Sequence, residues 1–259
     1  LGGLPAWIIL LFCTMASVYA AWTYNRVIIA HLALVGAYAI PFLLSDNSGQ
    51  YQLLLTYIAL INAGMLLLAF LKYWKSLQQA AFIITWLIFL AWYFQFTDGG
   101  RYDRLALTYA TIYFFIFYIS FLSYKFLRNE KYGLADLWSL LANAFVFFGI
   151  GYSILQDHYP GNGPGALFSL SNAAIYLLAG SLIWKKKGAD RSMAFLLMGL
   201  GVVFITLTIP IQFDGNWVTL FWLGEAVLLF AIAQRRGETP YALMALVLLC
   251  LGWASYALD

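Results

Sequence analysis

Two apolar segments, residues 166–184 and 192–212, are separated by the basic run Lys185-Lys186-Lys187-Gly188-Ala189-Asp190-Arg191. The same alternation runs through the whole chain, because twelve of its fourteen Lys and Arg residues fall in every second connection between apolar segments. Only Arg101 and Arg104 lie in the other set of connections. Membrane proteins retain positive residues in their cytoplasmic loops. The pattern therefore predicts a protein that crosses a membrane many times, with residues 185–191 on the cytoplasmic side.

The composition predicts the same class. The chain is 64% hydrophobic and only 10% charged, which leaves too little polar material to cover a soluble core. The inner connections and adjoining helix ends carry twelve cations against four acids, whereas the outer connections and the C-terminus carry two cations against six acids. A basic inner face suits contact with anionic lipid. The expected partner is therefore the lipid bilayer, and the charge gives no reason to expect nucleic acid.

Ten apolar segments are each 17 to 21 residues long, and about 20 residues are needed to cross the hydrocarbon as a helix. They lack the period-two alternation of barrel strands. We therefore predict an all-α, polytopic transmembrane helical bundle of about ten membrane-spanning helices, with both termini on the outer side. The predicted spans are residues 4–22, 27–44, 51–71, 77–96, 105–124, 135–155, 166–184, 192–212, 217–233 and 241–258.

The connections are too short to hold a soluble domain, so residues 1–259 are predicted to form a single transmembrane domain. Because the chain starts at Leu1 rather than at Met, we expect it to be part of a longer polypeptide. Upstream helices of that polypeptide, or other membrane subunits, are then expected as partners.

A four-helix internal repeat is a further prediction. Asn62-Ala63 and Asn172-Ala173 lie on segments that run in the same direction, and each Asn is followed thirteen residues later by a Lys. Transporters are often built from such repeats. Residues 51–155 and 166–258 are therefore predicted to share one helix arrangement.

Glu225 is the most informative polar residue, because it lies in the middle of the segment 217–233, which contains no cation. A charged group at the centre of a bilayer costs roughly 2.5–3.5 kcal/mol on insertion scales. Such a carboxyl group must be protonated, paired, hydrogen-bonded or in contact with water. The functional interpretation is a proton- or cation-coupling site or a ligand contact. The structural interpretation is a neutral Glu that bonds to a neighbouring helix.

Three further polar residues, Asn62, Thr85 and Asn143, occur at the depth of Glu225. With a rise of 1.5 Å per residue, all four lie about 12–14 Å from the cytoplasmic ends of their segments. We predict an intramembrane polar site in which at least two of the three lie close to Glu225. The alternative is a set of separate hydrogen bonds between helices.

Other residues give weaker predictions. His31 lies one turn inside the second segment, where it could relay protons or simply bond a backbone carbonyl. Pro41 and Pro210 are expected to kink or end their helices near the outer surface. Four glycines are expected where helices pack closely, namely Gly149, Gly151, Gly199 and Gly201.

No motif for a metal or a cofactor is found, so neither is expected. The Asp and His residues of the outer connections match no metal-ligand spacing, and solvated turn residues are the favoured interpretation of them. The chain also has no nucleotide-binding glycine pattern and no nucleophile elbow. Catalytic residues are therefore not assigned.

Two stretches of the sequence have the character of family signatures. One is Ile209-Pro210-Ile211-Gln212-Phe213-Asp214-Gly215-Asn216-Trp217-Val218-Thr219-Leu220-Phe221-Trp222, followed by Glu225. The other runs through residues 31–36, 41–45 and 57–64. Both resemble a widespread bacterial family of predicted polytopic membrane proteins, domain of unknown function 2339. The resemblance implies a longer, multi-pass protein of the bacterial inner (cytoplasmic) membrane, and no activity comes with it. It marks the following as family positions without a known role: Asn62, Pro210, Asp214, Gly215, Trp217, Trp222 and Glu225. His31 stands where a small residue is expected, so no shared role rests on it.

Three functions stay open on these grounds. The first is a transport or channel-like component, which rests on Glu225, the polar layer and the repeat. The second is a structural or assembly subunit of an envelope membrane complex, which rests on the short connections and the lack of a chemical motif. The third is a membrane-embedded enzyme that acts on a lipid-linked substrate at the outer face, through an Asp or His158. An enzymatic role is the least favoured of the three.

Overall fold

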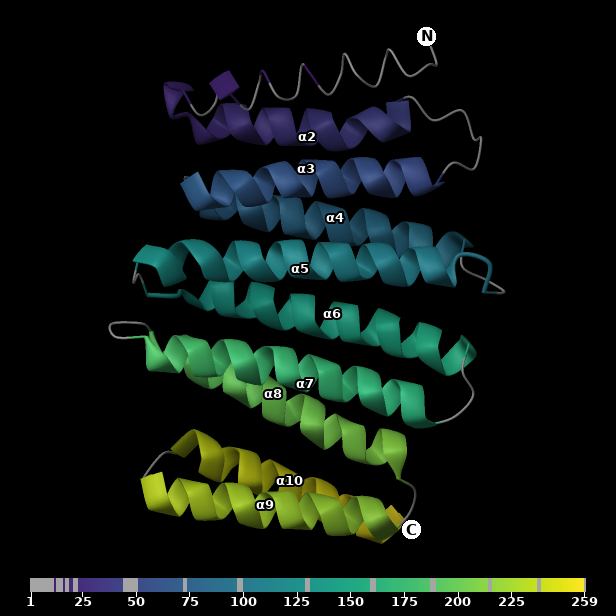
Figure 1. The fold of residues 1–259 in the computed structure, drawn as a ribbon, viewed down its shortest axis with the longest axis vertical. Helices are drawn as coiled ribbons and strands as arrows, with labels where there is room; N and C mark the ends of the chain where they lie inside the picture. Colours follow the sequence, from purple (N-terminus) through teal and green to yellow (C-terminus); the bar gives the residue numbers. More distant parts are fainter. Residues whose placement is uncertain are drawn as a thin grey trace. The chain divides into compact units, whose positions relative to one another are not determined.

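The computed structural model describes most of the chain, and every regular element in the described part is an α-helix. The described residues are 23–43, 51–71, 74–96, 100–128, 131–158, 162–186, 190–213, 216–236 and 239–258, with residues 12, 16, 19 and 20 before them. These residues form nine helices, shown in Figure 1: α2 (Val27–Leu43), α3 (Tyr51–Leu71), α4 (Lys75–Phe96), α5 (Asp103–Arg128), α6 (Leu134–His158), α7 (Asn162–Lys185), α8 (Arg191–Gln212), α9 (Asn216–Arg236) and α10 (Thr239–Leu258). The all-α class is confirmed, and nine predicted spans agree with these helices to within a few residues. Most of the predicted span 4–22 lies outside the described residues.

Six of these helices are long and apolar enough to cross a membrane. They contain the stretches Tyr51–Phe70, Lys75–Phe96, Asp103–Leu127, Leu134–Asp157, Gly163–Lys185 and Arg191–Gln212. Helices α2, α9 and α10 carry shorter apolar stretches, Val27–Ala39, Val218–Ala231 and Ala242–Ala254. Large apolar side chains are exposed on all nine helices, for example Leu87 on α4 and Leu228 on α9. Such surfaces would promote aggregation in water, whereas in a bilayer they contact acyl chains.

Local signals fix several helix ends. Asp190 caps the N-terminus of α8, because its Oδ1 accepts a hydrogen bond from the Ser192 backbone N–H at 2.9 Å. At the other end of α8, the Phe213 N–H donates to the Ile209 carbonyl at 2.9 Å. Gly100 precedes α5 with a φ of 77°, a left-handed conformation that glycine adopts without a Cβ clash. A capping side chain, a backbone hydrogen bond and a glycine thus mark these three helix ends.

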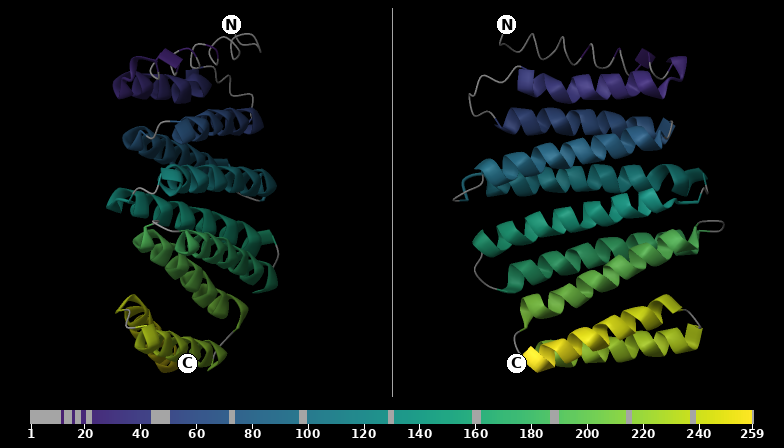
Figure 2. Two further views of the ribbon diagram at one scale, coloured as in Figure 1. Left: turned by 60° about the vertical axis from the view of Figure 1, so that its left-hand side comes forward. Right: turned by 180° about the vertical axis from the view of Figure 1, so that it is seen from behind.

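The chain divides into two compact units, residues 1–150 and residues 151–259, called here the first and second units. In the first unit α3 packs along α5, and α2 and α4 join them. Its core is aromatic, with Phe114 of α5 stacked on Phe147 of α6 at a ring-centroid distance of 4.3 Å. In the second unit α7 packs along α8, and α9 packs along α10, as Figure 2 shows.

Glycines bring α7 and α8 into close contact. A Cβ on Gly180 of α7 would lie 3.1 Å from the Met198 backbone N and 3.2 Å from the Ala194 carbonyl O of α8. A Cβ on Gly201 of α8 would lie 3.2 Å from the Ala173 carbonyl O of α7. A side chain of the facing helix lies nearer still, Met198 at Gly180 and Leu177 at Gly201, so neither position has room for a Cβ. Gly201 therefore confirms its predicted packing role, and the sequence argument missed Gly180.

The other three predicted glycines differ in how closely neighbouring atoms approach them. A Cβ on Gly151 would collide with the Phe168 ring, and one on Gly199 would lie 2.7 Å from the Met244 Cε. Both glycines therefore admit a neighbouring side chain. The prediction was wrong for Gly149, since no described atom lies within 4 Å of a Cβ built there.

Candidate functional site around Glu225

One part of the site is the backbone carbonyl of Thr206, which Pro210 deprives of its hydrogen-bond donor within α8. In an α-helix the N–H of residue 210 would donate to the carbonyl of residue 206. Pro210 has no N–H, so the Thr206 carbonyl loses this bond, although α8 continues to Gln212. The indole Nε1–H of Trp222 donates to that carbonyl O at 3.2 Å. Helix α9 thus supplies the hydrogen bond that α8 lacks.

Glu225 follows Trp222 by three residues on α9, so both side chains reach the same turn of α8. The Thr206 Oγ1 lies 2.8 Å from the Glu225 Oε1. The same Oγ1 lies 3.0 Å from the Val202 carbonyl O, one turn earlier on α8. The Glu225 Oε2 is buried and has no hydrogen-bond partner within the described residues. The carboxyl group is therefore held at one oxygen and unsatisfied at the other.

The surroundings of this carboxyl group are apolar. Ala226 and Leu229 of α9 pack against Ala245 and Leu248 of α10, and Val202, Trp222 and Met244 adjoin this cluster. The α10 sequence contains no charged residue. An ionised Glu225 would therefore lie in a medium of low dielectric without a nearby counter-charge, which is an expensive arrangement.

A second polar cluster joins three helices of the first unit. The Tyr38 hydroxyl of α2 donates to the Asn62 Oδ1 of α3 at 2.6 Å and lies 2.8 Å from the Thr85 Oγ1 of α4. The Asn62 Nδ2 donates to the Thr85 Oγ1 at 3.0 Å. All three residues are buried. The structure therefore brings together two predicted site residues, Asn62 and Thr85, and adds Tyr38, which the sequence argument missed.

Asn143 of α6 has different partners. Its Nδ2 donates to the Phe114 carbonyl O of α5 at 3.1 Å, and its Oδ1 accepts from the Trp86 Nε1 of α4 at 3.2 Å. These are hydrogen bonds between separate helices, as the alternative interpretation proposed. Glu225 belongs to the second unit, so its predicted proximity to Asn62, Thr85 and Asn143 stays a prediction.

The structure describes some of the other candidate site residues and not the rest. The His31 Nδ1 lies 2.9 Å from the Val27 carbonyl O on its own helix, which is the backbone contact considered above. Trp222 is part of the Glu225 site. Asp214 and the side chain of Trp217 lie outside the described residues. Among the residues that are described, no three His, Cys, Asp or Glu side chains come together as metal ligands.

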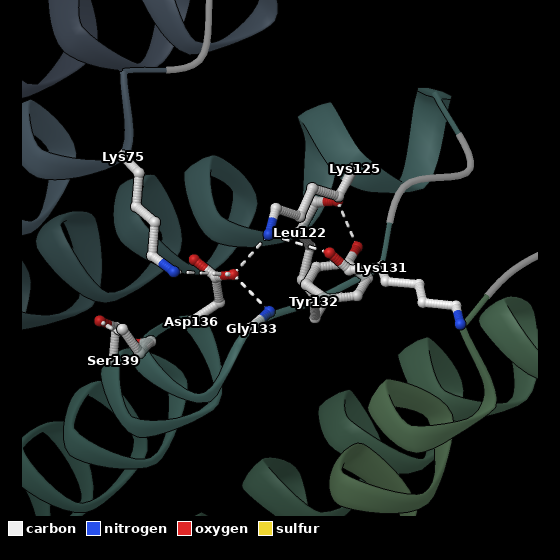
Figure 3. Close-up of polar contacts among 9 residues, drawn as sticks. Lys75, Leu122, Lys125, Lys131, Tyr132, Gly133, Asp136 and Ser139 are labelled. Atoms are coloured by element: carbon white, nitrogen blue, oxygen red, sulfur yellow. Dashed lines mark hydrogen bonds and ion pairs between the residues drawn. The ribbon is translucent and has the colours of Figure 1, made fainter.

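The sequence argument also missed a buried ion pair where α4 begins, α5 ends and α6 begins, drawn in Figure 3. The Asp136 carboxylate is fully buried, and its Oδ2 lies 2.5 Å from the Lys125 Nζ and 3.6 Å from the Lys75 Nζ. The same Oδ2 accepts the Gly133 backbone N–H at 2.8 Å, one half of a capping box at the start of α6. The Lys125 Nζ also donates to the Lys131 carbonyl O at 3.1 Å.

The apolar helices and the distribution of positive charge define a multi-pass α-helical membrane protein. Within that class, the chain belongs to the family described as "Predicted membrane protein (DUF2339)", whose model matches residues 1–258. The resemblance inferred from the sequence is thereby confirmed over almost the whole chain. No curated protein and no solved structure matches it. The family description gives no activity, so function has to be argued from the site.

Proposed function

We propose that this protein is a transport or channel-like component of the bacterial inner membrane, in which Glu225 binds the ion that is coupled to transport. One observation carries the proposal: the Glu225 Oε1 contacts the Thr206 hydroxyl, while the Oε2 is buried without a partner in the described part of the chain. A buried polar atom without a hydrogen bond costs about 1–3 kcal/mol. Ionisable residues inside a membrane mark ion pathways and proton relays. A bound proton or cation would offset that cost.

The neighbouring helix supports the same proposal. Transporter sites lie beside helices that are interrupted by Pro or Gly, where freed backbone groups line the binding site. Pro210 interrupts the hydrogen bonding of α8 at Thr206, and both Glu225 and Trp222 contact that residue. The proposal keeps Asn62, Thr85 and Asn143 as polar groups at the same depth. The proposal also includes the predicted topology, with ten membrane-spanning helices and both termini on the outer side, and the predicted location in the inner membrane of a bacterium.

An assembly subunit of an envelope membrane complex is the second candidate. The polar contacts of Tyr38, Asn62, Thr85 and Asn143 favour it, because these side chains bind one another or backbone carbonyls in the manner of a rigid scaffold. This function predicts that the full-length protein copurifies with other membrane subunits. It also predicts that Glu225→Gln alters stability alone.

Ion flux in liposomes that contain the purified protein separates the two candidates. Gradients of H⁺, Na⁺ and K⁺ are imposed one at a time, and the internal ion concentration is followed with a sensitive dye. We expect the wild type to dissipate at least one gradient faster than empty liposomes do, and Glu225→Gln to abolish the difference. Ser171→Ala is the matched control, because among the described residues this exposed hydroxyl bonds the Leu167 carbonyl of its own helix, at 2.8 Å.

Two results would decide against transport. One is a wild-type flux equal to that of empty liposomes for all three ions. The other is a flux that Glu225→Gln leaves unchanged while Ser171→Ala behaves as the wild type does. Either result would favour the assembly subunit.

A further inference from the structure

We infer that the ion bound at Glu225 is a proton, held on the neutral carboxyl group and shared with the Thr206 hydroxyl. The inference rests on the proposed function and names its ion. It depends on the contacts of one hydroxyl group, on the charges around the site and on the number of oxygen atoms that converge there.

The Thr206 hydroxyl has one proton and two acceptors within reach. Its Oγ1 lies 3.0 Å from the Val202 carbonyl O and 2.8 Å from the Glu225 Oε1. A carbonyl oxygen only accepts, so the bond to Val202 uses the hydroxyl proton. With a proton on the Glu225 Oε1, this atom donates the shorter hydrogen bond to the Thr206 Oγ1, and the hydroxyl proton stays free for the Val202 carbonyl. A protonated Glu225 therefore satisfies both contacts in one chain, from the acid through the hydroxyl to the carbonyl.

Loss of the proton reverses the direction of this chain. When water removes the proton from the Glu225 Oε1, the Thr206 hydroxyl rotates its own proton from the Val202 carbonyl to the new carboxylate. The Val202 carbonyl keeps its helical bond within α8. When water returns a proton to Glu225, the hydroxyl turns back to Val202. No covalent bond other than the O–H bond to the transferred proton changes, and Thr206 has a hydrogen bond to Glu225 in both states.

The charges on the packed helices favour the neutral acid. On α8 the charged residue is Arg191, about 22 Å along the helix from Thr206. On α9 the first cation after Glu225 is Arg235, about 15 Å along the helix. Helix α10 has no charged residue, and its titratable groups are Tyr241, Cys250 and Tyr256. No cation on these helices therefore neutralises an ionised Glu225 at close range.

The described residues place fewer oxygen atoms at the site than Ca²⁺ or Mg²⁺ takes. These hard cations take six or more oxygen ligands. The site offers the two carboxyl oxygens of Glu225, the Thr206 Oγ1, the Val202 carbonyl O and the Thr206 carbonyl O. The Trp222 Nε1–H already occupies that carbonyl at 3.2 Å, and an N–H donor repels a cation. By donating to the Thr206 carbonyl O, Trp222 makes this oxygen unavailable as a ligand for a cation.

Infrared spectroscopy of the purified protein at neutral pH tests the inference directly. A protonated carboxylic acid gives a C=O stretching band that a carboxylate lacks. The chain contains only three glutamates, Glu130, Glu225 and Glu238, and only Glu225 lies inside an apolar segment. Carboxyl-¹³C glutamate should therefore shift this band in the wild type without any mutation. We expect Glu225→Gln to remove the shifted band.

Thr206 is tested with two variants of similar size. Thr206→Ser keeps the hydroxyl group and should preserve the frequency of the band, whereas Thr206→Val should move it, because the acid loses its acceptor. A change in packing alone would affect both variants alike.

The outcomes separate the inference from the proposed function. Absence of a ¹³C-sensitive protonated band would overturn the inference, and a Glu225-dependent flux of Na⁺ or K⁺ would then leave transport standing. A band that is present without any ion flux would retain the bound proton and overturn transport. A band together with a Glu225-dependent proton flux supports both.

Discussion

The buried ion pair where α4 begins, α5 ends and α6 begins predicts different losses of stability for its members. The side chain of Asp136 is 1% exposed, that of Lys125 is 10% exposed and that of Lys75 is 40% exposed. Removing one partner of a buried pair costs about 3–5 kcal/mol, because the other charge stays buried and unpaired. Exposed pairs contribute about 0–1 kcal/mol. We therefore expect Asp136→Asn and Lys125→Met each to cost about 3–5 kcal/mol, and Lys75→Met at most about 1 kcal/mol.

The free energy of unfolding can be measured by titration with sodium dodecyl sulfate in mixed micelles, followed by circular dichroism. The control is the double variant Lys125→Met with Asp136→Leu, which leaves no unpaired charge at this buried pair. Replacing both partners by apolar residues is often neutral or stabilising, so the double variant should be more stable than either single variant. The reasoning is refuted if Lys75→Met costs as much as Lys125→Met, or if the double variant loses the sum of the two single effects.

Three further predictions use the same titration. Tyr38→Phe should cost about 0.6 kcal/mol, the average for hydrogen bonds between membrane helices, and at most about 1.7 kcal/mol; a neutral result would show that Asn62 and Thr85 suffice. Trp222→Phe should cost about 1–3 kcal/mol, because the Thr206 carbonyl loses its hydrogen-bond donor. The same change should cost less in a Pro210→Ala background, where residue 210 supplies a backbone N–H to that carbonyl. Additive effects of the two substitutions in this double-mutant cycle would contradict the proposed contact. Gly180→Ala should cost about 1–3 kcal/mol through overpacking against α8. Gly64→Ala should be close to neutral, because no atom of the described residues lies within 4 Å of a Cβ added there; equal losses would argue against close packing at Gly180.

The positions of the helices could be predicted from the sequence because the bilayer imposes a length on each apolar segment. Residues 51–71 and 192–212 are continuous apolar runs between polar ends, and α3 and α8 follow them closely. Glu225 could be selected because an acid in such a run is rare. Thr206 could not be selected by polarity alone, since a Thr usually bonds its own helix. The signal for it was Pro210, which removes the N–H that residue 206 would otherwise accept.

The hydrogen-bond partners of a residue on neighbouring helices were harder to predict from the sequence than its depth along its own helix. Thr85 and Asn143 were placed at one depth, yet Asn143 turns to Trp86 and Phe114, while Thr85 turns to Tyr38 and Asn62. Depth follows from counting residues, whereas direction depends on how each helix is rotated about its axis. Asp136 was counted only among the four acids of the inner connections and helix ends for the same reason, because its burial depends on how α4 and α5 pack around it. The internal repeat stays a prediction.

The bond between Trp222 and Thr206 has a consequence for the biogenesis of this protein. Helix α8 is synthesised before α9, and until α9 is in place the Thr206 carbonyl has neither a helical donor nor the indole. An unsatisfied backbone group in hydrocarbon costs several kcal/mol, which disfavours the release of α8 into lipid by itself. The two helices are joined by a short connection at residues 213–215. They are therefore expected to leave the translocon together, as a preassembled hairpin.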